Sequence, residues 1–141
     1  MGKKRIVKKG GEESAARSGS SRVSKRKMDS GIMYVEATYN NTKVSIADTA
    51  GNVVAWSSSG SLGFAGAKKG TPFAAAKVGE LLGDRALQMG VKEVSVVVSG
   101  VGAGRESSIR AFGTKGIHIT SIKDTTPVPH NGPRPPKPRR V

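Results

Sequence analysis

Alternating apolar and polar positions between residues 32 and 58 predict a meander of three antiparallel strands. Residues 32–39 are rich in strand-forming side chains, and residues 42–47 place apolar side chains at every second position. Asn40 and Asn41 tolerate positive φ angles, so they suit the turn of a hairpin between these two strands. A second turn over residues 48–52 leads into a third strand at 53–58.

Apolar side chains at three- and four-residue spacing predict a helix over residues 71–90. Thr71 is a good N-terminal cap, Pro72 suits the first helical position, and Gly90 marks the end. We expect one apolar stripe of this helix to face the sheet. The stripe consists of Val78, Leu81, Leu82, Leu87 and Met89.

The sequence from residue 91 onward predicts a strand, a short helix and a final strand. Residues 91–99 contain nearly continuous valine, which indicates a central strand covered on both faces. A glycine-rich turn over 100–104 leads into a helix at about 105–115, and the last strand begins at Ile117. The order βββαβαβ predicts an α/β fold with a mixed sheet and right-handed crossovers, and it resembles the ribonuclease H-like fold.

Positive charge is concentrated at both ends of the chain. The formal net charge is +14, from 24 basic and 10 acidic side chains in 141 residues. Residues 1–27 carry +8 and residues 127–141 carry +4, which leaves only +2 between them. The first segment cannot bury enough apolar area to fold alone, and six prolines give the last segment an extended path. We therefore predict a disordered basic tail (1–27), one α/β domain (28–126) and a proline-rich basic tail (127–141).

Composition and residue placement argue against several kinds of chemistry. There is no cysteine, which rules out disulfides, zinc knuckles and thiolate catalysis. No apolar run suits a signal peptide or a membrane span, so we expect a soluble, cytoplasmic protein without membrane contacts. His118 falls in a strand, His130 falls in the tail and the carboxylates are spread singly, so we expect no enzyme, metal or cofactor. The strong positive charge favours nucleic acid as a partner.

The turn before the second predicted helix is a candidate phosphate site. Glycine amides at a helix N-terminus favour anions. The dinucleotide fingerprint fails because its third glycine falls on Arg105, and no phosphate-loop lysine closes the turn. What remains is an anion nest with Arg105, Ser107, Ser108 and Arg110 nearby, which suits one phosphate of an RNA backbone. A tight strand-to-helix turn with no ligand is an equally good alternative.

Lys68 and Lys69 lie in a glycine-rich segment, residues 59–70, that we expect to be a mobile basic loop suited to a ribose-phosphate groove. Simple solvation of two loop lysines is the alternative. Of the aromatic side chains near this loop, Trp56 and Phe73 are expected in the core, and Phe64 is the stacking candidate.

Three functions fit these features. The first is a non-enzymatic structural RNA-binding protein, in which basic tails give affinity and the folded body gives register. The second is a metal-dependent nuclease on the ribonuclease H-like fold, against which the scattered acidic residues speak. The third is a general DNA-compacting protein, for which basic tails suffice.

Several short blocks of sequence together carry a more specific resemblance. They are Asn40-Asn41-Thr42, Gly51-Asn52, Trp56, residues 69–75, Gly104-Arg105-Glu106-Ser107, Ile109-Arg110-Ala111, Pro129-His130-Asn131-Gly132 and Arg134-Pro135-Pro136-Lys137. In these blocks the chain is similar to the bacterial small-subunit ribosomal protein eleven family, from about residue 30 to the C-terminus.

The resemblance implies a ribonuclease H-like body without catalytic activity or cofactor, placed on the platform of the small ribosomal subunit. There it would bind and bridge small-subunit rRNA helices and help form the cleft for the Shine-Dalgarno helix, close to messenger RNA. The neighbours it implies are ribosomal proteins seven and eighteen and initiation factor three.

The resemblance, together with the anion nest and the basic residues of the tail, yields a set of expected rRNA contacts. They are Asn40, Asn41, Lys68, Lys69, Gly102, Gly104, Arg105, Ser107, Arg110, His130, Arg134, Lys137, Arg139 and Arg140. Asn131 precedes glycine and is prone to succinimide closure, and the family carries isoaspartate there, so we predict the same modification. The chain departs from many members at Val101 and Ala103, where they have proline, and at Pro133, where they have cysteine.

Overall fold

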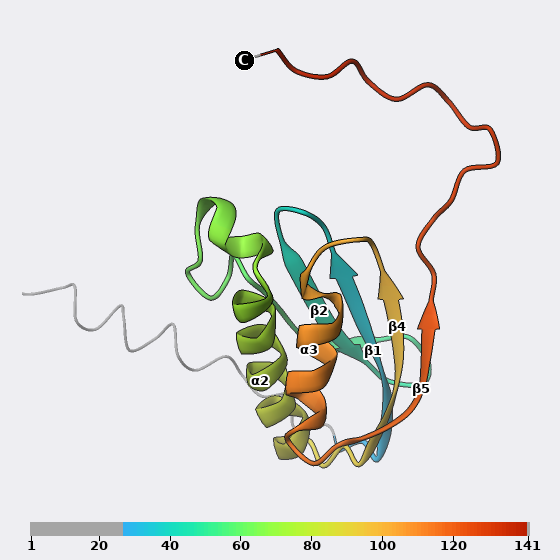
Figure 1. Ribbon diagram of the computed structural model, residues 1–141. Coiled ribbons are helices and arrows are strands. Elements are labelled where there is room, and N and C mark those ends of the chain that lie inside the picture. The colour runs from blue at the N-terminus through green and yellow to red at the C-terminus, as the bar shows by residue number, and fades with distance from the viewer. Residues whose placement is uncertain (1–26, 141) are drawn as a thin grey trace, which may run out of the picture.

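Five strands form one mixed sheet, and two α-helices cover one of its faces (Figure 1). The computed structural model describes residues 27–140, so the predicted N-terminal tail lies outside the described residues except for Lys27. In chain order the elements are β1 (Ser30–Ala37), β2 (Thr42–Ala47), β3 (Val53–Ser58), the 3-10 helix η1 (Gly66–Gly70), α2 (Pro72–Gln88), β4 (Glu93–Ser99), α3 (Gly104–Gly113) and β5 (His118–Asp124). The predicted α/β class is confirmed. Within residues 27–140, no helix is both long and apolar enough to cross a membrane.

The strands lie in the order β3-β2-β1-β4-β5, so the middle strand is β1 and not β4. β1, β2 and β3 form the predicted antiparallel meander, whereas β4 runs parallel to both β1 and β5. Side chains of β4 alternate: Val94, Val96 and Val98 are buried, while Ser95 and Val97 are half-buried on the other face. The prediction that β4 lies inside the sheet is confirmed, since it pairs with β1 and β5. The expectation that it is covered on both faces is wrong, because both helices lie on one side of the sheet and, within residues 27–140, leave its other face open.

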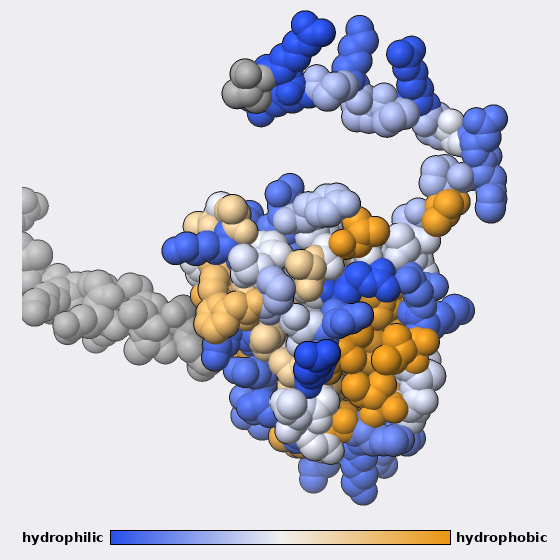
Figure 2. All heavy atoms as spheres, in the orientation of Figure 1, coloured by the Kyte–Doolittle hydropathy of each residue, from blue (hydrophilic) through white to orange (hydrophobic). Residues whose placement is uncertain are grey.

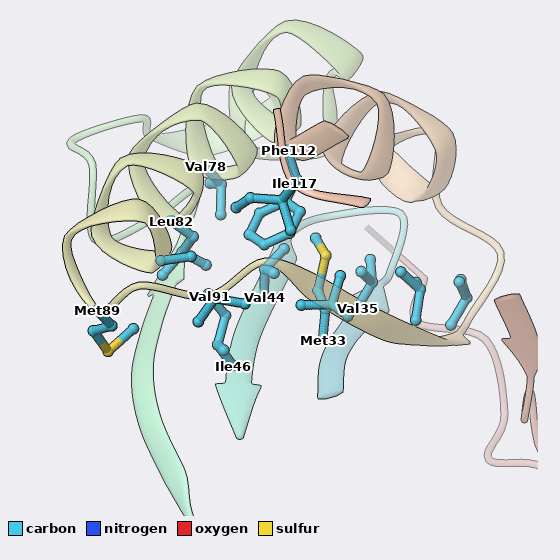
Figure 3. Packing of buried hydrophobic residues seen from close by; sticks show 14 residues of the cluster. Met33, Val35, Val44, Ile46, Val78, Leu82, Met89, Val91, Phe112 and Ile117 are labelled. Atoms are coloured by element: carbon cyan, nitrogen blue, oxygen red, sulfur yellow. The ribbon is translucent and has the colours of Figure 1, made fainter. Parts of the chain in front are cut away.

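The hydrophobic core lies between the covered face of the sheet and the two helices (Figure 3). Phe112 of α3, Met33 of β1 and Leu82 of α2 are among its largest fully buried side chains. Full burial of a side chain of this size stabilises the fold by about 1.5–3 kcal/mol. The core therefore joins both helices to the middle of the sheet.

Small residues form much of the buried surface of α2. Its buried positions are Ala74, Ala75, Val78, Gly79, Leu82, Gly83 and Ala86. A Cβ atom at Gly79 would lie 2.4 Å from the backbone oxygen of Ser108 in α3. The absence of a side chain at Gly79 thus sets how closely the two helices approach.

The predicted stripe of α2 is only partly correct. Val78, Leu82 and Met89 are buried, but Leu81 is half-buried and Leu87 is 47% exposed. Successive helical residues are separated by about 100° around the axis, so a residue next to a buried position can lie outside the buried arc. Leu87 lies outside this arc, next to the buried Ala86.

Trp56 and Phe73 are exposed, so the prediction that they pack in the core is wrong. Trp56 is 54% exposed because it pairs with Ser45 on the open face of the sheet, while the next residue, Ser57, points inward. Phe73 is 63% exposed because the buried arc of α2 begins one residue later, at Ala74.

Candidate nucleic-acid interface

Four segments far apart in the sequence meet at one end of the sheet (Figure 1). β1, β3, β4 and β5 run in the same direction, so the segments that follow them leave from the same edge. We call this edge the loop end. It consists of the hairpin turn 38–41, residues 59–71, the turn 100–103 and the chain from residue 125 onward. The residues predicted to contact rRNA all lie in these segments or in the first two turns of α3.

The hairpin turn 38–41 is closed by its own hydrogen bonds. The Thr38 amide donates to the Asn41 carbonyl over 2.8 Å, and the Asn41 amide donates to Thr38 Oγ1 over 3.1 Å. Asn40 is exposed, whereas the Oδ1 atom of Asn41 is buried without a hydrogen-bond partner within residues 27–140. A buried acceptor that lacks a donor costs about 1–3 kcal/mol. The two hydrogen bonds fix the backbone of the turn, and the exposed Asn40 side chain is accessible to a partner.

Lys68 and Lys69 are carried by η1, a 3-10 helix in the segment that we expected to be a mobile loop. The hydroxyl of Thr71 donates to the Lys68 carbonyl over 2.7 Å and also caps the first turn of α2. Gly70 packs against the hairpin turn, since a Cβ atom there would lie 2.1 Å from the carbonyl oxygen of Tyr39. The two lysines are thus held beside the hairpin turn.

The turn 100–103 packs closely against the end of β1. Gly100 has a φ of +98°, and a Cβ atom there would lie 2.0 Å from the Ala37 carbonyl oxygen. The Gly102 amide donates to that same carbonyl over 3.0 Å, and the Gly100 amide donates to Thr126 Oγ1 over 3.1 Å. Because both glycine amides are used within the protein, the candidate anion site narrows to the first turn of α3.

A hollow of about 210 Å³ opens at this first turn. Ala103 provides no side-chain cap, and the first amides of a helix have no acceptor within it. The Arg105 amide donates outside the helix, to the Gly102 carbonyl, over 3.4 Å. Ser108, predicted near the site, is buried and donates to the Gly104 carbonyl over 2.9 Å. The hollow is lined by Gly102, Ala103, Arg105, Glu106, Ser107 and Arg110.

The charges at the hollow are of both signs. Arg110 is exposed and has no ion-pair partner in the described part of the chain, so its guanidinium is available to a phosphate. Glu106, also in the first turn, opposes an anion there. Arg110 is therefore the basic side chain of the hollow best placed to bind RNA.

The Arg105 side chain forms an ion pair and hydrogen bonds within the protein. Its Nη2 atom pairs with Asp124 Oδ2 at 2.8 Å, and its Nη1 atom donates to the Gly100 carbonyl and, over 3.4 Å, to Thr126 Oγ1. Hydrogen bonds from Thr126 and from Arg105 hold the pKa of the Asp124 carboxyl well below its ordinary value. This set of contacts, the Arg105 clasp, joins the turn 100–103 to the start of the C-terminal tail.

The C-terminal tail, residues 127–140, contains no helix or strand and runs away from the body (Figure 1). Figure 2 shows hydrophilic side chains along much of its length. Asn131 has a φ of 60° and is the one non-glycine residue with positive φ in the described range. The tail residues predicted to contact rRNA are all exposed: His130, Arg134, Lys137, Arg139 and Arg140.

The exposure of two aromatic side chains, one in the loop end and one directly after it in α2, was missed by sequence reasoning. Tyr39, in the hairpin turn, is 79% exposed, and Phe73, in the first turn of α2, is 63% exposed. The position of Tyr39 next to the Asn40-Asn41 turn was the available signal, because the tip of a tight turn projects from the sheet whatever its side chain. Within residues 27–140, no three His, Asp or Glu side chains gather as a metal site requires.

Comparisons with known proteins point to one family. A family model described as ribosomal protein S11 matches residues 31–140. A protein of Gloeobacter violaceus is 54% identical over 89% of this chain and 96% of its own length. One of Thermosynechococcus vestitus is 54% identical over 91% and 98%, and one of Synechococcus elongatus is 55% identical over 85% and 92%. All three are named small ribosomal subunit protein uS11.

Proposed function

The chain belongs to the ribosomal protein S11 family, and from this premise we propose that it is a structural constituent of the small ribosomal subunit that binds small-subunit rRNA. The family is structural and non-enzymatic, so the metal-dependent nuclease is no longer an alternative. One observation carries this proposal: four segments converge at or beside the loop end and together form the proposed binding surface. They are the hairpin turn, η1, the first turns of α3 and the basic tail.

The chemistry of the loop end supports RNA as its partner. Lys68 and Arg110 are exposed, and the tail adds four basic side chains, all of which suit phosphate oxygens. Asn40 offers an amide that can both donate and accept hydrogen bonds. RNA is recognised largely through shape, loops and backbone contacts, which a surface built from several loops and a tail can follow.

The finer parts of the proposal follow the family. The body, residues 28–126, would lie on the platform of the subunit in the cytoplasmic ribosome and bridge rRNA helices, with the two tails anchoring it. It would help form the cleft for the Shine-Dalgarno helix near messenger RNA, beside ribosomal proteins seven and eighteen and within reach of initiation factor three. The mixed sheet and its element order support a ribonuclease H-like kinship for the body.

The test is binding of the full chain to small-subunit rRNA, to unrelated structured RNA and to duplex DNA over a salt series. Neutralising about six to ten phosphates should weaken binding by roughly 10³- to 10⁵-fold between 50 and 200 mM salt. We expect a preference for small-subunit rRNA that persists in a variant ending at Val128, with lower affinity and a smaller salt slope. Equal affinity for duplex DNA and rRNA would favour a general DNA-compacting protein instead.

A further inference from the structure

Within residues 27–140, two aromatic side chains are exposed at or beside the loop end: Tyr39 precedes η1 in the sequence and Phe73 follows it. Tyr39 is 79% exposed and Phe73 is 63% exposed. Exposing this much aromatic surface forgoes part of the free energy gained on burial, about 25 cal/mol per Å² of apolar area. Such side chains next to positive charge are suited to stacking with nucleic-acid bases.

Phe73 is supported by its neighbours. The half-buried Phe64 ring meets it edge-on, with 6.1 Å between ring centroids and an angle of 85° between the planes. The ammonium of Lys77 lies 5.5 Å from the centroid of the Phe73 ring. Phe64 thus holds Phe73 in place, while most of the Phe73 ring remains accessible. The roles differ from the sequence prediction, which chose Phe64 as the stacking residue.

The backbone at Tyr39 is also held in place by its neighbours. It occupies the hairpin turn that Thr38 and Asn41 close with their hydrogen bonds. Its carbonyl oxygen packs against Gly70 at the end of η1, where a Cβ atom would lie only 2.1 Å away. The phenol ring therefore projects from a turn whose backbone is fixed on two sides, which lowers the entropy lost when a base stacks on it.

Charge at these rings favours a nucleotide over an apolar peptide. Lys68 and Lys69 occupy the last turn of η1, and Lys77 lies over Phe73. Glu80 offsets part of this charge through a 3.4 Å ion pair with Lys77. The remaining positive charge matches the phosphates that accompany stacked bases.

We propose that Tyr39 and Phe73 are stacking residues for unpaired bases of RNA, with Lys68, Lys69 and Lys77 contacting the phosphates of the same segment. This inference rests on the proposed function and adds to it a base-contacting subsite. Stacking is tolerant of sequence because every base has an aromatic face. The subsite therefore contributes affinity at unpaired positions, and shape and backbone contacts supply the specificity.

The first test measures rRNA affinity of the full chain with Phe73→Leu and Tyr39→Leu, which keep apolar bulk but remove the aromatic face. Loss of one stacked base should weaken binding roughly 5- to 150-fold, with the salt slope unchanged because no phosphate contact is lost. Phe73→Tyr should bind as the parent does. Leu87→Ala is the matched control, since Leu87 is an exposed apolar residue in the last turn of the same helix.

The second test does not depend on ribosomal RNA. The double variant Trp56→Phe, Phe73→Trp places the one tryptophan of the full chain at the proposed stacking position. A single-stranded oligoadenylate should quench its fluorescence, while an abasic oligonucleotide of the same length and charge should not. Equal quenching by both probes, or no quenching by either, would overturn the stacking role even if the chain binds rRNA. Quenching by oligoadenylate alone, without any rRNA preference, would support the stacking subsite and count against the proposed function.

Discussion

The close contact between α2 and α3 predicts different effects for two alanine substitutions one turn apart in α2. Gly79 and Gly83 are both buried in this helix. In Gly79→Ala the new Cβ would lie 2.4 Å from the Ser108 backbone oxygen and 3.1 Å from Ala111 Cβ. In Gly83→Ala the nearest atoms are Cγ and Cβ of Lys115, at 2.6 and 3.1 Å, in a residue that lies beyond the end of α3.

At each site, the gain in helix propensity and the cost of overpacking decide whether the substitution stabilises or destabilises the protein. Replacing glycine by alanine inside a helix stabilises it by about 0.5–1 kcal/mol. At Gly79 this gain is opposed by overpacking, which costs about 1–3 kcal/mol, because a backbone carbonyl moves only with the whole of α3. We therefore expect Gly79→Ala to lower the free energy of unfolding by roughly 0.5–2 kcal/mol.

Gly83→Ala is the matched control, for which a much smaller change in stability is expected. Rotation about χ1 can move Lys115 Cγ away, at the cost of the ion pair with Asp84, which is 3.1 Å long and partly exposed. The Cβ contact at 3.1 Å is relieved by a shift of a few tenths of an ångström in the segment after α3. Such pairs contribute about 0–1 kcal/mol, so their loss offsets part or all of the helix gain of about 0.5–1 kcal/mol. The free energy of unfolding should therefore lie between about 0.5 kcal/mol below and 1 kcal/mol above that of the parent.

Urea unfolding followed by circular dichroism at 222 nm would measure both variants. With a slope of about 1–3 kcal/mol per molar urea, the two midpoints should differ by several tenths of a molar or more, Gly79→Ala being the lower. A Gly79→Ala protein as stable as the parent would refute the reasoning, since it would mean that the helices separate at negligible cost. So would a Gly83→Ala protein that is the less stable of the pair.

Three further predictions concern the loop end and the tail. Replacing Lys68 and Lys69 by alanine should weaken binding to all RNAs alike and reduce the salt slope by about 2, measured by filter binding; an unchanged slope would count against phosphate contacts. Hydrogen bonds from Thr126 and the neighbouring guanidinium lower the pKa of Asp124 from its ordinary 3.8, so the stability this carboxylate contributes is complete above that pH and is lost as the pH falls below it. Asp124→Asn should flatten the loss of stability between pH 5 and 2 in urea titrations, and equal acid sensitivity of both proteins would contradict this. Peptide mapping of aged protein should find isoaspartate at Asn131, and recovery of unmodified asparagine alone would exclude it.

Local signals predicted the elements well. Thr71 and Pro72 marked the start of α2 because capping chemistry acts within a few residues, and the observed helix begins at Pro72. The meander followed from alternation and from the turn at Asn40-Asn41, and β1, β2 and β3 lie close to their predicted bounds. Such features depend on neighbours in the chain, which the sequence displays directly.

Features that depend on distant contacts were not predictable in the same way. Nothing local shows that both helices cover the same face, so the valines of β4 and the position of Trp56 were misjudged. Arg105 pairs with Asp124, which lies 19 positions away in the sequence. Only the folded chain shows this pair, which engages within the protein a guanidinium that was predicted to contact RNA. The gathering of four loops at one edge follows from strand direction, which the sequence pattern leaves open.

During synthesis, the three strands of the meander leave the polypeptide exit tunnel long before β4. Tyr34 in β1 pairs on one side with Ser45, which follows almost at once, and on the other with Val97. At about 5–20 residues synthesised per second, Val97 emerges roughly 3–12 s after Tyr34. For that interval one backbone edge of β1 is an open template for any extended strand. The nascent chain is therefore most vulnerable to misassociation at the strand that becomes the best protected in the finished protein.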